Sequence, residues 1–165
     1  MLLTHGTATG REEGQRLLRP GDCQVWQPWD TPQAVAKFLA HFQPRVGLLM
    51  ETEVWPNWVA ACRRSGVPLI LANARLSEKS LAQARRLAWL SRPAYAGLSS
   101  VWAQTEPDAQ RLRNGFSRND AFMAGLMRQP GWRSNIANCP EARHIGAAQA
   151  IRFDMAAVCR DAERF

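Results

Sequence analysis

The chain has 165 residues, of which 46% are apolar and 21% charged, an ordinary globular composition that is sufficient for one domain with a real core. Its net charge of +7 comes almost entirely from arginine, which suits an anionic partner, although a solvated basic face needs no partner at all. The sequence has no run of eighteen apolar residues, so we expect no transmembrane segment.

The four cysteines form no CxxC pair and do not cluster with histidine at metal-ligand spacing. We therefore expect no metal site and interpret the cysteines as reduced thiols.

The first predicted strand, residues 2–4, ends in a turn rich in glycine and threonine, and a helix is predicted to follow from Arg11. Backbone N–H groups and the hydroxyls of Thr7 and Thr9, beside Gly10, could hold an anion at this turn. A threonine that only caps the helix would explain the same residues equally well.

A second strand is predicted over residues 23–28, and a helix follows it to residue 42. Asp30 or Thr31 can cap this helix, and Pro32 suits its first turn. Its apolar residues recur at helical spacing and predict one face packed on a sheet. These residues are Val35, Phe38, Leu39 and Phe42.

The central feature of the sequence is an apolar run, residues 46–50, followed by Glu51 and Glu53. Such a run is typical of a parallel strand buried on both faces. A helix is predicted from Pro56 to about Arg64. Ligands of parallel sheets bind outside the carboxyl ends of the strands, so both carboxylates are predicted to lie where chemistry is usually done.

The next predicted strand, residues 67–72, also ends on a polar turn, from which Arg75 should emerge at the same edge as Glu51. The acids could accept hydroxyl protons from a sugar-like ligand, and Arg75 could pair with a phosphate. The alternative is a buried Glu–Arg pair that only orders two turns.

The remaining sequence continues the alternation of strands and helices. Five or six strands in this pattern predict a three-layer α/β sheet that is parallel. The expected elements are a long helix over 81–90 broken at 91–93, a strand over 99–104, a helix through residue 112 closed by Asn114–Gly115, a short strand over 121–125 and a helix over 156–165.

Four strings in this chain resemble the 3-deoxy-D-manno-octulosonic acid (Kdo) transferases, bacterial enzymes that add Kdo from CMP-Kdo to the lipid A precursor. The resemblance covers residues 1–125 and is highly specific in the second and third strings. The strings are Thr7–Gly10, Met50–Asn57, Ala72–Ser77 and Ala103–Asp108.

The resemblance implies a partial acceptor-side Rossmann-like domain over residues 1–125, an incomplete amino-terminal half of a GT-B glycosyltransferase. It places Glu51 on the family carboxylate that steadies the transition state. It also implies a peripheral enzyme on the cytoplasmic face of the inner membrane that uses no cofactor, with the lipid A precursor as acceptor, CMP-Kdo as donor and the anionic membrane surface as partner. The residues that it places on the acceptor side are Thr7, Thr9, Gly10, Glu53, Arg75 and Ser77.

The sequence also departs from the family pattern. The family's general base lies in a Ser-Val-Gly-Glu turn upstream of the threonine-rich turn, and no residue here replaces it. Arg128 is the candidate stand-in for the family's transition-state lysine. Residues 126–165 are expected to be a poorly ordered, off-family tail, as a frameshift would produce, and we expect this chain to lack the donor domain.

We therefore expect the chain alone to be inactive. The alternative is a non-catalytic module that binds phosphorylated lipid or a partner glycosyltransferase. Nucleic acid is not expected, because Trp55, Trp58 and Trp102 occupy core-like positions rather than a surface strand.

Overall fold

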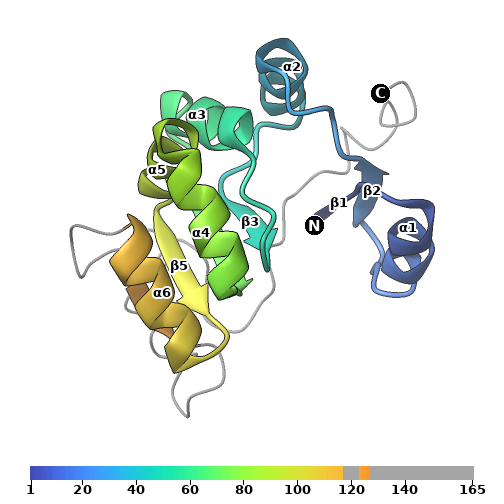
Figure 1. Ribbon diagram of the computed structural model, residues 1–165. Coiled ribbons are helices and arrows are strands. Elements are labelled where there is room, and N and C mark those ends of the chain that lie inside the picture. The colour runs from blue at the N-terminus through green and yellow to red at the C-terminus, as the bar shows by residue number, and fades with distance from the viewer. Residues whose placement is uncertain (117–122, 127–165) are drawn as a thin grey trace.

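The computed structural model describes residues 1–116 and 123–126, which form an α/β structure with parallel strands (Figure 1). The first unit is a pair of parallel strands, β1 (Leu2–His5) and β2 (Cys23–Trp26), with helix α1 (Ala8–Gln15) packed on both. Helix α2 (Pro32–Phe42) leads from this unit to the second sheet.

The second sheet contains four parallel strands in the order β3-β4-β5-β6. They are β3 (Gly47–Met50), β4 (Leu69–Ala74), β5 (Ser100–Ala103) and β6 (Met123–Leu126). The predicted α/β class and parallel pairing are confirmed, but the expected single sheet is wrong, because β1 and β2 pair only with each other among the described strands. Apolar runs predict strands, whereas tertiary packing decides which strands become neighbours.

Four helices follow the strands of the second sheet and lie together on one side of it (Figure 1). Because the strands run in sequential order, right-handed crossovers place every connecting helix on the same face. The third layer that the sequence predicts is therefore not seen in the described residues. The helices are α3 (Pro56–Arg64), α4 (Glu78–Arg86), α5 (Ala88–Ala96) and α6 (Glu106–Phe116).

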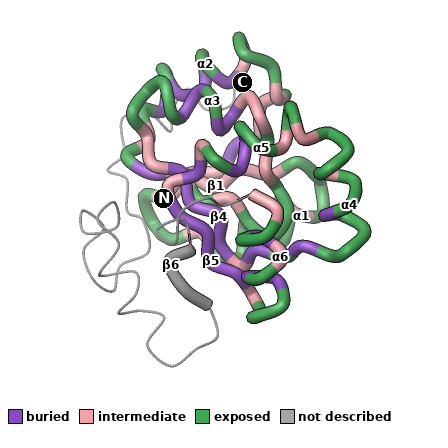
Figure 2. The backbone as a smooth tube through the Cα atoms, turned by 60° about the vertical axis from the view of Figure 1, so that its left-hand side comes forward, coloured by how far each residue is buried: buried purple, intermediate pink, exposed green. Residues whose placement is uncertain are grey.

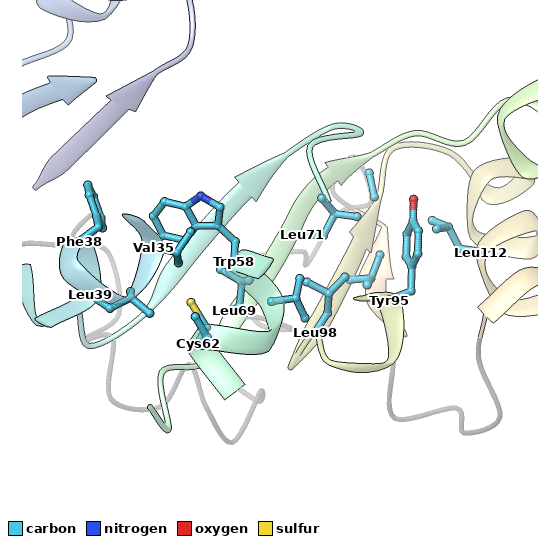
Figure 3. Close-up of a cluster of buried hydrophobic side chains, with 14 of the residues drawn as sticks. Val35, Phe38, Leu39, Trp58, Cys62, Leu69, Leu71, Tyr95, Leu98 and Leu112 are labelled. Carbon is cyan, nitrogen blue, oxygen red and sulfur yellow. The ribbon is translucent and has the colours of Figure 1, made fainter. Parts of the chain in front are cut away.

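The core lies between this helix layer and the sheet, and α2 contributes to it through α3 (Figure 3). The apolar face predicted for α2 is confirmed, since all four of its residues are buried. The Phe38 and Trp58 rings meet edge-on with centroids 5.0 Å apart.

Cys62 is a free thiol in this core, and burial raises its pKa to about 11. Cys23 is disulfide-bonded, so the prediction of four reduced thiols is wrong.

Strand β3 differs from its prediction. Leu48 and Met50 are 41% and 49% exposed, so the strand is not buried on both faces. Leu48 and Met50 share one face of β3, and Leu49 on the other face packs against the core. Strand β3 is the edge strand of the second sheet, whereas β4 and β5 lie inside it and are buried (Figure 2). The apolar run identifies a strand but does not show whether a further strand covers its edge.

Two predicted helix ends are also wrong. The long helix breaks at Leu87, whose backbone is not helical, and continues as α5 with Pro93 inside it. Pro93 is tolerated because the carbonyl that loses its donor belongs to the exposed first turn of α5, where water can bond it. Gly115 does not close α6, which continues to Phe116, because it lies against Leu81 and a Cβ there would sit 2.7 Å from Leu81 Cδ1.

The short strand predicted over 121–125 is confirmed as β6, which covers Met123–Leu126 of the described residues. The helix predicted over 156–165 and Arg128 lie outside the described residues.

Candidate active site

The turn after β3 holds Glu51 in a left-handed backbone conformation, with φ of 58°. Its amide donates to the Ala72 carbonyl at 2.9 Å, and its own carbonyl accepts from the Arg75 amide at 3.3 Å. Asn73, on the neighbouring strand, also has a positive φ, of 52°. A left-handed residue other than glycine costs about 1–2 kcal/mol, and such residues concentrate at functional sites.

The side chains of Glu51 and Arg75 meet at this edge of the sheet, as the sequence predicts. The carboxylate Oε2 lies 3.7 Å from Arg75 Nη1, and the two side chains are 50% and 56% exposed. The alternative of a buried pair is therefore wrong. A long, half-exposed ion pair leaves most of the hydrogen-bonding capacity of both groups open to a ligand.

Glu53 has a different task in the same turn. Its Oε2 accepts a hydrogen bond from Trp55 Nε1 at 2.8 Å, which orients the indole. Trp55 is 38% exposed, so its predicted core position is wrong, whereas Trp58 and Trp102 are buried. The physical reason is that Trp55 precedes the first turn of α3 and does not join its buried face.

The turn is fixed from outside by Asp30, a contact that the sequence does not reveal. Asp30 accepts from the backbone amides of Asn57 at 3.2 Å and Trp58 at 3.0 Å, and the Asn57 side chain donates to the Asp30 carbonyl at 2.6 Å. Asp30 thus caps α3, while Thr31 caps α2. The sequence pattern indicates Asp30 and Thr31 as possible caps of α2, but it cannot show that Asp30 caps α3 instead.

The threonine-rich turn is shorter than predicted. Thr7 caps α1 by accepting from the Gly10 amide at 3.1 Å, so the helix begins at Ala8 and includes Thr9 and Gly10. The capping alternative therefore accounts for the Thr7 hydroxyl. These residues follow β1, and within the described part of the chain no hydrogen bond or ion pair joins them to Glu51 or Arg75.

Ser77 is also a cap. Its hydroxyl accepts from the Ser80 amide at 3.1 Å and lies 2.9 Å from the Ser80 hydroxyl, which fixes the start of α4 two residues after Arg75. Helix α4 therefore begins at Glu78, three residues before the predicted range of 81–90.

A second acid–arginine pair lies at the same edge, and the sequence did not predict it. Asp108 is 7% exposed, and its Oδ1 accepts from the Leu76 amide at 3.0 Å and from Arg111 Nη2 at 2.9 Å. Its other oxygen accepts from the Thr105 hydroxyl, and Arg111 Nε donates to the Leu76 carbonyl. The Thr-Glu-Pro-Asp string by itself indicates only a local helix cap, because the partner Leu76 is 32 residues away.

Asp108 is held in its ionised form. Burial alone would raise its pKa, but hydrogen bonds from Leu76, Thr105 and Arg111, together with the charge of Arg111, lower the pKa below 3.8. The bond to Asp108 correspondingly raises the pKa of Arg111. With its lone pairs occupied, this carboxylate is a structural link between β4 and α6.

Within the described residues, no group of three histidine, cysteine or acidic side chains is placed to hold a metal ion. The helices of that part of the chain are also too short or too polar to cross a bilayer.

Parallel strands that end on acidic and basic turns are consistent with a Rossmann-like α/β domain, a class in which ligands bind at this edge of the sheet. The family model of 3-deoxy-D-manno-octulosonic-acid transferase (kdotransferase) matches residues 1–128, and the chain belongs to this family. The resemblance found in the sequence is thereby confirmed, and the fold is consistent with the amino-terminal domain of such a glycosyltransferase.

Several curated relatives carry the same name. The 3-deoxy-D-manno-octulosonic acid transferase of Bordetella pertussis is 53% identical over 117 residues, 68% of this chain and 27% of the relative. That of Haemophilus influenzae is 32% identical over 59% of this chain and 21% of the relative. A probable mitochondrial 3-deoxy-D-manno-octulosonic acid transferase of Arabidopsis thaliana is 39% identical over 48% of this chain and 18% of the relative. The chain thus spans roughly a quarter or less of these relatives, and no solved structure matches it.

Proposed function

We propose that this chain is the acceptor side of a GT-B glycosyltransferase that adds Kdo from CMP-Kdo to the lipid A precursor at the cytoplasmic face of the inner membrane. The observation that carries the proposal is the half-exposed Glu51–Arg75 pair at the carboxyl edge of the sheet, in a chain of the Kdo transferase family. This edge is where a Rossmann-like domain offers its groups to a ligand.

Glu51 is the proposed transition-state carboxylate. Departure of the nucleotide from a sugar donor leaves positive charge on the anomeric carbon, and a fixed carboxylate stabilises that charge. The positive φ of Glu51 and its two backbone bonds to β4 and Arg75 hold the carboxylate in place without burying it. Arg128 remains the proposed counterpart of the family lysine.

Arg75 is the proposed phosphate ligand of the acceptor. Its ion pair with Glu51 is long enough, at 3.7 Å, to be exchanged for a bidentate contact with a phosphate. Thr7, Thr9 and Gly10 at the start of α1, and Ser77 at the start of α4, lie at helix N-termini, whose dipoles favour an anion. Glu53 acts indirectly, through Trp55, on the shape of the acceptor side.

A chimaera tests the catalytic proposal. The segment of this chain that aligns with the Bordetella pertussis relative replaces its counterpart there, and Kdo transfer from CMP-Kdo to lipid IVA is measured. We expect transfer at a rate close to that of the parent enzyme, because the edge residues come from the same family. A folded chimaera without transfer would contradict the proposal.

We also propose that the purified chain binds the acceptor without turnover, because its sequence contains no Ser-Val-Gly-Glu string, the turn that carries the family's general base. Binding of lipid IVA without transfer is also what the alternative function, a non-catalytic binding module, predicts. The half-exposed Arg75 favours that alternative as much as the enzyme. The chimaera separates them, since a binding module would not support transfer, and turnover by the purified chain would refute the proposed inactivity.

A further inference from the structure

All the charged residues of the segment between Glu78 and Glu106 are basic. They are Lys79, Arg85, Arg86 and Arg92. The three arginines are exposed and, among the described residues, none of them forms an ion pair. Four other arginines, at positions 16, 75, 111 and 113, do pair with acids. The positive charge of this segment is therefore concentrated and uncompensated.

The same segment exposes large apolar side chains where α4 ends and α5 begins. Trp89 is 75% exposed, Leu87 45% and Leu90 38%. Trp89, Arg92, Pro93 and Ala96 are all exposed and recur at helical spacing, so α5 has an outward stripe opposite its buried Ala94 and Tyr95. We name Arg85, Arg86, Leu87, Trp89, Leu90 and Arg92 the α4–α5 corner (Figure 1).

We propose that the α4–α5 corner docks on an anionic phospholipid bilayer. A tryptophan with neighbouring leucines suits the boundary between headgroups and acyl chains, and arginine is attracted to anionic headgroups by about 1 kcal/mol per residue. A binding face with charge of one sign and exposed aromatic and aliphatic side chains fits a lipid surface better than a protein partner, because the core of a protein interface is depleted of charge.

One short helix joins the corner to the candidate site. Helix α4 begins directly after Ser77 and contains nine residues, which span roughly 14 Å and lead away from Arg75. A bilayer on the corner therefore meets the end of α4 that lies farther from Arg75. The inference deepens the proposed function, on which its biological setting rests, by naming the surface that meets the membrane. Vesicle binding itself does not depend on catalysis.

The test is sedimentation of the full chain with vesicles of neutral phospholipid alone or with 30% anionic phospholipid, compared in low and high salt. We expect binding to the anionic vesicles that falls with salt. Arg86→Ala/Arg92→Ala should weaken it by about 30-fold, at roughly 1 kcal/mol per arginine, and Trp89→Ala should weaken it several-fold.

Two matched control variants change residues elsewhere on the surface. Arg63→Ala/Arg64→Ala removes the same charge from the end of α3, and Trp29→Ala removes a tryptophan that is 85% exposed. Equal losses in the controls, no loss in the corner variants, or self-association that Trp89→Ala abolishes would each overturn the proposal. Transfer by the chimaera to detergent-dispersed lipid IVA should survive Trp89→Ala, so a failed docking site is distinguishable from a failed catalytic site.

Discussion

Two acid–arginine pairs lie at the same edge of the second sheet and differ in almost every physical respect. Glu51 and Arg75 are 3.7 Å apart and half-exposed. Asp108 and Arg111 are 2.9 Å apart, and the Asp108 carboxylate is nearly buried and saturated with hydrogen bonds. The two pairs follow neighbouring strands, so position in the fold alone does not separate a structural pair from a functional one.

The hydrogen-bonding capacity that remains available, rather than the position in the fold, indicates the functional pair. Asp108 can accept little more, and breaking its contacts would leave the Leu76 amide without a partner in a buried setting. Glu51 has oxygens open to solvent, a weak partner and a backbone conformation that costs energy. The predictions below test this contrast.

The largest effect is expected for Glu51→Gln in the chimaera. Losing the carboxylate should lower kcat by about 10²–10³-fold, the usual cost of removing one group that stabilises transition-state charge. The matched control is Glu106→Gln, because Glu106 is a similarly exposed member of an ion pair, with Arg113. Comparable losses of kcat in both variants would show that Glu51 has no special role.

Asp108→Ala should destabilise the chain by about 3 kcal/mol, since it leaves buried donors without an acceptor. Urea unfolding followed by fluorescence of the buried Trp58 and Trp102 measures this free energy. Glu51→Gln, the comparison variant, should change it by less than about 1 kcal/mol. If the two values were similar, the assignment of Asp108 as the structural acid would be wrong.

The contribution of Asp108 to the free energy of unfolding should depend on pH. Its folded-state pKa is lowered from 3.8, so the contribution is fully present above the unfolded pKa and is lost as pH falls through the folded pKa. The gap in unfolding free energy between the natural chain and Asp108→Asn should therefore be constant from neutral pH to about 4 and shrink below that. A gap that grew on acidification would contradict the sign of the shift.

Arg75→Ala should weaken binding of lipid IVA to the chain by about tenfold, as expected for one charge-assisted phosphate contact. Its effect on unfolding should be small, because its ion pair is exposed. Arg113→Ala, which removes the arginine of the other exposed pair, is the control in the same binding assay. Unchanged affinity in the Arg75 variant would remove Arg75 from the acceptor site.

The smallest effect concerns the backbone of Glu51. The backbone at position 51 has a φ of 58°, which glycine adopts more easily than alanine. The Glu51→Gly variant should therefore be more stable than Glu51→Ala by about 1 kcal/mol. Both variants lack the carboxylate, so the difference in thermal unfolding isolates backbone strain. A more stable alanine variant would show that the turn is not strained.

Much of the fold follows from local patterns that the sequence displays. The apolar spacing of α2 predicts its four buried residues, and Pro32 and Pro56 mark helices that begin there. The rule that parallel strands end at one edge is sufficient to bring Arg75 to Glu51. These features depend on residues close in sequence or on a general property of parallel sheets.

The errors concern contacts between distant segments. Leu48 and Met50 are apolar, yet they are exposed because they share the face of the edge strand β3 opposite Leu49, which packs against the core. Trp55 is equally apolar but is held at the surface by Glu53. The hydrophobicity of a side chain shows that it can be buried, but whether it is buried depends on which segments pack against it.

Local features of the sequence are sufficient to identify the family, the parallel α/β class and the two strand ends on which Glu51 and Arg75 meet, because they involve residues close together in the chain. Three features depend on tertiary packing: Asp30 caps α3, Asp108 is bonded to Leu76, and Glu51 keeps an exposed carboxylate on a left-handed backbone. The physical reason is that hydrogen bonds and exposure depend on which distant segments pack together, and similar acids end in opposite environments.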